Sequence, residues 1–187
     1  ILSKIKARDG VYSVLGNHDY SAYSNFPDSI QWKYVEELKS RQRDMGWNLL
    51  LDENVNIVRD EDTISLIGVE NISTHRAFLS YGNLQKAMQD ANGSYKILLS
   101  HDPTHWELEV KDNPEIDLML SGHTHAMQFS IFGWSPSSFI FKEVTGLFRH
   151  ENQYLYVNIG LGETVMKARI GTKPEITVFN IQKTTYN

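Results

Sequence analysis

Cysteine is absent from the 187-residue sequence, and basic and long apolar runs are also missing. Without Cys, the chain has no disulfide framework, no thiolate zinc site, no redox pair and no Cys nucleophile. The 18 Lys and Arg are outnumbered by 23 Asp and Glu, and the formal net charge is -5. This balance argues against a broad nucleic-acid-binding face, so we expect no nucleic-acid partner. No apolar stretch reaches the roughly 18 residues that indicate a membrane span.

The internal organisation of the sequence points to one unit, and its start indicates that a segment upstream has been removed. The first residue is Ile1 and not Met, and Ile1 to Arg8 lacks the layout of a signal peptide. We find no internal repeat, no low-complexity tract and no linker long enough to separate two domains. Hydrophobic residues make up 41% of the chain, an ordinary share for a globular domain.

Three predicted strands each end in a polar, His-containing segment. Val11 to Leu15 stops at Gly16-Asn17-His18-Asp19, Lys96 to Leu99 stops at Ser100-His101, and Leu118 to Leu120 stops at Ser121-Gly122-His123. In an open α/β sheet, ligands gather at the carboxyl ends of the strands, where the loops converge. The pattern therefore predicts a site formed by three strand ends.

The remaining periodicity predicts helices mixed with strands. Pro27 to Met45 has helical spacing of apolar residues, and Asp28 or Ser29 is a candidate cap. A second helix is expected over 84–91, and further strands over 64–68, 154–158 and 175–181. This mixture predicts α/β layers around a pair of sheets.

The segment Gly122-His123-Thr124-His125 is the strongest chemical signal. Two His separated by one residue after a Gly turn can both aim neutral imidazole nitrogens at metal ions. Gly16-Asn17-His18-Asp19 is ambiguous alone, because Gly-Asn favours a turn and Asp can cap the next segment.

Taken together, these three motifs in this order resemble the calcineurin-like metallophosphoesterase superfamily. The resemblance is closest to its bacterial, often membrane-associated branch, and it extends weakly through Thr145-Gly146-Leu147 and Gly160-Leu161-Gly162. It implies a four-layer α/β/β/α sandwich. It also implies hydrolysis of a phosphomonoester or phosphodiester by a hydroxide that bridges two divalent ions.

The resemblance also implies a role for particular residues. Asn17, His101 and His123 would bind one ion, and His125 the other; Mn, Fe or Zn suits such ligands. His18 would be the general acid, oriented by Asp19. His105, close to His101 in the sequence, either lines the substrate pocket or has a capping or surface role.

The family pattern is incomplete in this sequence. The family also uses an Asp-x-His and a Gly-Asp motif, which supply two ligands of the first ion and the carboxylate that bridges both ions. Neither motif occurs here. Either the chain is truncated at its N-terminus or it is a family member that has lost its metals, and the retained ligand positions favour truncation.

Truncation has several expected consequences. Residues 1–187 would be the C-terminal portion of one metallophosphoesterase domain, with N-terminal strands absent, impaired or no activity and at most partial metal occupancy. Uncovered sheet edges and apolar surface would favour self-association. The resemblance implies that the parent protein is a phosphohydrolase of the often membrane-associated bacterial branch.

Two interpretations stay open for the substrate and for the function as a whole. The apolar segment 128–141 is either a lid for an amphiphilic, lipid-linked phosphoester or, as we favour from sequence, core between sheets. The alternative to an enzyme is a metal-free protein-interaction module on the same fold.

Overall fold

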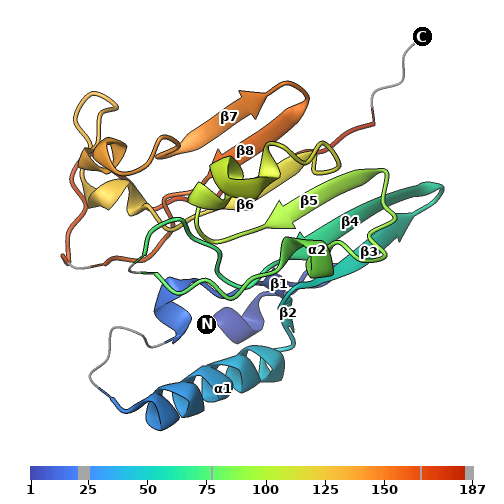
Figure 1. Cartoon of the computed structure of the whole chain (residues 1–187), viewed down its shortest axis with the longest axis horizontal. Coiled ribbons are helices and arrows are strands. Elements are labelled where there is room, and N and C mark those ends of the chain that lie inside the picture. Colours follow the sequence, from blue (N-terminus) through green and yellow to red (C-terminus); the bar gives the residue numbers. More distant parts are fainter. Residues whose placement is uncertain (21–25, 77, 165, 184–187) are drawn as a thin grey trace.

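The computed structural model describes residues 1–20, 26–76, 78–164 and 166–183, which form two β-sheets with helices packed around them (Figure 1). The smaller sheet pairs β1 (Tyr12–Ser13) with β2 (Asn48–Leu49) in parallel. The larger sheet has six strands in the order β3-β4-β5-β6-β8-β7. The α/β sandwich expected from the sequence is confirmed.

The six-stranded sheet has a parallel centre and antiparallel edges. At one edge, β3 (Glu53–Arg59) and β4 (Asp62–Gly68) form a hairpin. The strands β5 (Tyr95–Leu99), β6 (Leu118–Ser121) and β8 (Gln153–Val157) follow in parallel with β4. At the other edge, β7 (Gly146–His150) runs antiparallel to β8. The carboxyl ends of β4, β5, β6 and β8 therefore meet at one side of the sheet, the place where α/β proteins bind ligands.

Helix α1 (Asp28–Asp44) packs with the smaller sheet. Leu15, Tyr20, Val35 and Leu49 form the apolar cluster between them. The expectation that Asp28 or Ser29 caps this helix is wrong, because Pro27 holds the cap position and makes no side-chain cap bond. Asp28 instead lies in the first turn, where a carboxylate interacts favourably with the helix dipole.

Short helical segments complete the chain. Helix α2 (Leu84–Ala87) is shorter than the sequence suggested, and its cap is the Asn83 side chain, which accepts a hydrogen bond from Lys86 N. None of the helices among the described residues combines the length and the apolar character needed to cross a membrane. The other segments are η1 (Leu2–Lys4), η2 (Asn17–Tyr20), η3 (Trp106–Val110), η4 (His125–Gln128) and η5 (Pro136–Phe139).

The tail differs from its predicted form. No strand is assigned over 175–181 in the described part of the tail. Its contacts with the sheet run largely through side chains, since Tyr156 donates to Glu175 and Asn158 donates to Thr177.

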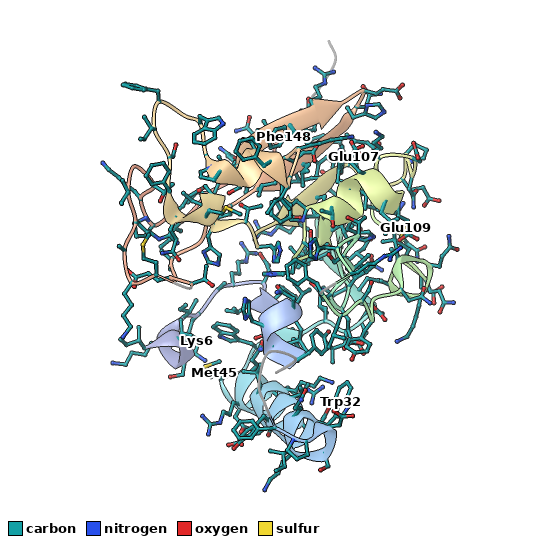
Figure 2. The ribbon with its side chains drawn as sticks, turned by 60° about the vertical axis from the view of Figure 1, so that its left-hand side comes forward. Lys6, Trp32, Met45, Glu107, Glu109 and Phe148 are labelled. Atoms are coloured by element: carbon teal, nitrogen blue, oxygen red, sulfur yellow. The ribbon has the colours of Figure 1, made fainter. Side chains whose placement is uncertain are left out.

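The two faces of the large sheet are buried to different extents. One face is fully buried under α2 and η3, with Ile67, Leu98, Met119 and Leu155 all at 0% exposure. Phe148 of β7 packs against the same core (Figure 2). The opposite face carries alternate residues that are only half-buried, such as Leu66, Leu99, Leu120 and Tyr156.

Candidate metal centre

The three His-containing motifs come together at the carboxyl side of the sheets. Asn17 opens η2 after β1, His101 follows β5, and His123 follows β6. Backbone bonds fix the last two relative to each other, because Gly122 N donates to the His101 carbonyl at 3.0 Å. The Ser121 hydroxyl also donates to the Ser100 carbonyl at 2.7 Å. Neighbouring parallel strands thus hold two imidazoles at adjacent positions.

Three donor atoms converge on one point. The Asn17 Oδ1 atom lies 2.9 Å from His101 Nε2 and 3.0 Å from His123 Nδ1. The two imidazole nitrogens lie 3.1 Å apart. An amide oxygen and two imidazole nitrogens are ligands that suit borderline divalent ions such as Mn, Fe and Zn. The donor set therefore fits one metal ion.

The convergence stops short of a complete centre. Among the described residues, no three His, Cys, Asp or Glu side chains are grouped so that they could hold an ion without further ligands. The third donor here is the neutral amide of Asn17, which is 1% exposed. None of the three donors carries a negative charge, so the cluster has no carboxylate ligand.

Burial keeps the imidazoles of the cluster neutral. Desolvation, with a smaller contribution from the neighbouring His123, lowers the pKa of His101 to about 3. Desolvation also lowers the pKa of His123, which nearby Asp102 partly offsets. A neutral imidazole has a lone pair available for a metal ion, whereas an imidazolium has none.

Close backbone packing holds His101 in place. A Cβ added at Gly16 would lie 2.6 Å from the His101 ring, nearer than real Cβ atoms come to other atoms. The Gly of the first motif is therefore required by the approach of the β1 tip to His101.

The turn after β6 has a left-handed backbone. His123 has φ 68°, and His125, Ala126, Met127 and Gln128 all have φ between 47° and 56°. This region is sparsely populated by residues other than Gly, and such strain concentrates at functional sites. The turn is anchored by Thr124 Oγ1, which donates to the Val144 carbonyl at 2.7 Å.

His125 lies beside the convergent donors and contacts a cation. Its Nδ1 atom is 3.4 Å from Arg169 Nη2. Desolvation and the Arg169 guanidinium both lower the pKa of His125. Charges on His125 and His18 also act on His101 and His123, which shows that the four imidazoles share one region. His125 is thus placed near the cluster, and no group of three His, Cys, Asp or Glu that could hold a second ion is found among the described residues.

His18 and Asp19 follow Asn17 on η2. His18 is exposed on η2. The Asp19 carboxylate accepts a hydrogen bond from Gly16 N at 2.7 Å, and burial raises its pKa. Asp19 therefore binds the backbone at the tip of β1 directly.

His105 is placed away from solvent. It is 0% exposed, its Nδ1 atom is 2.9 Å from Ser100 Oγ, and its Nε2 atom is 3.1 Å from Glu109 Oε2. Glu109 projects from η3 (Figure 2). With both nitrogens occupied in the core, His105 has no access to a substrate in this structure, so we assign it a structural role.

Sequence reasoning missed several neighbours of the centre. The rings of Phe78 and Phe141 pack edge-on against His123, with centroids 4.9 and 5.4 Å away. Asp102, fully buried, also faces His123. The signal for Asp102 was its position directly after His101, but Asp-Pro also reads as an ordinary turn.

A cavity of about 160 Å³ adjoins this side of the molecule. It shares Phe141 with the wall of the cluster, and Lys142 and Glu107 form an ion pair of 2.7 Å at its rim. Its lining residues are Thr74, Pro103, Thr104, Glu107, Ile140, Phe141, Lys142 and Glu143.

Comparison with known proteins identifies the family of this chain. The family model described as "Calcineurin-like phosphoesterase" matches residues 1–127, more than half of the chain. The chain belongs to this family.

Curated relatives share the similarity over almost the whole chain. The metallophosphoesterase YkoQ of Bacillus subtilis is 30% identical over 188 residues, covering 96% of this chain and 63% of YkoQ. The "Transmembrane protein with metallophosphoesterase domain" of Bos taurus is 30% identical over 188 residues, covering 97% of this chain and 40% of that protein. The chain thus spans less than two thirds of the length of either relative.

A solved structure is also similar. The NAD nucleotidase of Haemophilus influenzae is 15% identical, with a TM-score of 0.44, covering 78% of this chain and 29% of that one.

Proposed function

We propose that this chain supplies part of the dinuclear metal centre of a metal-dependent phosphohydrolase. The observation that carries the proposal is the convergence of Asn17 Oδ1, His101 Nε2 and His123 Nδ1 within 3.1 Å of one another. Two divalent ions, when bound, supply an activated water and neutralise charge on the phosphoryl group. Family membership makes this chemistry the natural one for the cluster.

The residues of the chain then have distinct tasks. Asn17, His101 and His123 hold one ion, and His125 belongs to the second. His18, which is exposed on η2, gives a proton to the leaving oxygen of the phosphoester in this proposal. Asp19 fixes the backbone that carries His18, through its bond to Gly16 N.

The carboxylate ligands lie, in this proposal, upstream of Ile1 in the natural protein. Three neutral donors bind an ion weakly, and the described residues add no carboxylate to them. The curated relatives are longer than this chain, which is consistent with further ligands outside it. The 187 residues alone would hold metal only partially and would hydrolyse substrate slowly or not at all.

An amphiphilic phosphoester, including a lipid-linked one, is the substrate class that the surface favours. Ile131, Phe132, Trp134, Phe139 and Ile140 are all exposed, with Phe132 at 107% and Phe139 at 83%. The segment therefore does not fill a core in this structure, contrary to the interpretation that we favoured from sequence. The exposed segment ends at Phe141, which packs on His123. The apolar surface therefore reaches the candidate centre.

The first experiment measures bound Mn, Fe and Zn by elemental analysis. It uses this chain and the same protein extended upstream to its natural start, each with His123→Ala and, as control, His150→Ala at an exposed position. We expect about two ions in the extended protein, a loss in His123→Ala and no loss in His150→Ala. The loaded extended protein should then hydrolyse p-nitrophenyl phosphate or its diester.

The contrary result is equally clear. An extended protein that is folded, metal-free after supply of all three ions and inactive on both substrates would contradict the proposal. The metal-free interaction module would then be the better description of this domain.

A further inference from the structure

Asp102 has one carboxylate oxygen that ordinary turn formation does not explain. The side chain is 0% exposed. Its Oδ1 atom accepts from Thr104 N at 2.9 Å and from Thr104 Oγ1 at 2.8 Å, which completes an Asp-Pro turn. Its Oδ2 atom is buried without a hydrogen-bond partner among the described residues. Unpaired buried carboxylate oxygens are costly, so this atom calls for a function.

The Oδ2 atom faces the back of a candidate metal ligand. His123 Nε2 lies 3.7 Å from it, and the His123 side chain is 8% exposed. The other ring nitrogen, Nδ1, is the atom that converges with Asn17 Oδ1 and His101 Nε2. One imidazole thus has a carboxylate on one nitrogen and the convergent donors on the other.

Neutral imidazole carries a single proton, on either Nδ1 or Nε2. A carboxylate beside Nε2 favours the tautomer with the proton there, which leaves the Nδ1 lone pair free. We propose that Asp102 is a positioning residue that holds His123 in the Nε2–H tautomer and thereby prepares Nδ1 to bind a divalent ion. This inference rests on the proposed function, because it assumes that the cluster binds metal.

The packing around the ring supports this role. Phe78 and Phe141 meet the His123 ring edge-on at 78° and 80°. Rings on both sides restrict rotation of the imidazole, so the choice that remains is which nitrogen bears the proton. The Asp102 carboxylate lies beside Nε2 and favours the tautomer with the proton on that nitrogen.

A second carboxylate and imidazole pair in the same segment provides the contrast. Glu109 contacts His105 Nε2 at 3.1 Å, but His105 Nδ1 is bonded to Ser100 Oγ. No lone pair is left for an ion at His105. The same pairing is therefore structural at His105 and prepares a ligand at His123.

The test compares Asp102→Asn with Glu109→Gln in the protein extended to its natural start. The Asn oxygen can keep both bonds from Thr104, while its amide group donates toward Nε2 and favours the opposite tautomer. We expect Asp102→Asn to lower Mn²⁺ affinity by about 10- to 100-fold in calorimetric titration. Glu109→Gln makes the same chemical change at a His without a free nitrogen and should leave that affinity unchanged.

A second readout does not depend on bound metal or on the folding of Asp102→Asn. In metal-free wild-type protein labelled with ¹⁵N-His, nitrogen chemical shifts should show His123 as the Nε2–H tautomer, with the signal assigned through His123→Gln. This measurement shows which nitrogen of His123 carries the proton even if Asp102→Asn fails to fold. Circular dichroism would reveal such a failure.

The outcomes separate the two proposals. Mn²⁺ binding by wild type with equal binding by folded Asp102→Asn, or an Nδ1–H tautomer in wild type, would overturn the role of Asp102 and leave the phosphohydrolase standing. No binding of Mn²⁺, Fe²⁺ or Zn²⁺ by the extended wild type would overturn the proposed metal centre and this inference with it.

Discussion

Asn17 Oδ1 and His101 Nε2 lie 2.9 Å apart although 84 positions separate them in the chain. The contact joins the tip of the smaller sheet to the tip of the larger one. It exists because Gly16 lets the backbone of the first tip approach the His101 ring.

Replacement of Gly16 by Ala should therefore disturb the cluster. The added Cβ would overlap the half-buried His101 ring, so we expect a loss of about 1 to 3 kcal/mol in the free energy of unfolding and a loss of bound metal in the extended protein. Urea unfolding and elemental analysis measure the two effects. Gly162→Ala is the matched control, because a Cβ there meets nothing within 4 Å and its φ is not positive. Equal behaviour of the two variants would contradict the close-packing argument.

The lowered imidazole pKa values predict how stability changes with pH. His101 titrates near pH 3 in the folded chain, against 6.5 as its ordinary value, because of burial and then His123. Between these values the unfolded state binds the extra proton, so the free energy of unfolding rises with pH through this window. Stability at this site should be fully present above about pH 6.5 and fall progressively on acidification.

Urea unfolding at several pH values checks this dependence. The midpoint should fall from neutral pH toward pH 4, and His101→Gln should show a smaller fall because it cannot take up that proton. His150→Ala, at an exposed position, controls for the loss of an imidazole in general. An identical pH slope in wild type and His101→Gln would show that other groups are responsible.

The sequence predicted the parts of this site that follow from local rules. Strands 96–99 and 118–120 end in polar residues, and their tips meet because neighbouring parallel strands end on the same side. His105 looked similar in sequence, being four residues from His101, yet its short helical turn directs it into the core. That difference depends on tertiary packing with Ser100 and Glu109, which no local pattern contains. The apolar segment 128–141 was misjudged for the same reason, since composition does not tell whether another layer covers it.

The half-buried face of the large sheet predicts self-association of these 187 residues. Burial alternates along β8: Leu155 and Val157 are fully buried, whereas Tyr154 and Tyr156 are only half-buried. Burying such a face against a second copy removes apolar surface from water. Light scattering at tens of micromolar should give a mass above the 21.5 kDa of one chain. A mass of one chain throughout that range would contradict this prediction, and extension of the protein upstream should reduce association if the added residues cover the face.

The exposed apolar segment predicts binding to lipid. Phe132 follows Ile131 and precedes Gly133 in a tight turn, closed by the backbone bonds between Ile131 and Trp134, and it is fully exposed at the tip. From 126 to 141 the sequence has no charged residue, and Lys142 follows. Aromatic side chains on an uncharged turn partition favourably into the interface of a bilayer.

Sedimentation with vesicles of phosphatidylcholine and phosphatidylglycerol in equal parts measures this binding in the extended protein. Phe132→Ser should release the protein from the vesicles, and Val58→Ser, which removes an apolar side chain 64% exposed on β3, should not. Neither residue belongs to the candidate centre, so hydrolysis of a water-soluble phosphoester should be equal in both variants. If Phe132→Ser lowers hydrolysis of a lipid-linked phosphoester while leaving the soluble one unchanged, the segment brings an amphiphilic substrate to the centre. Equal sedimentation of wild type and both variants would instead remove the reason for favouring lipid-linked substrates over soluble ones.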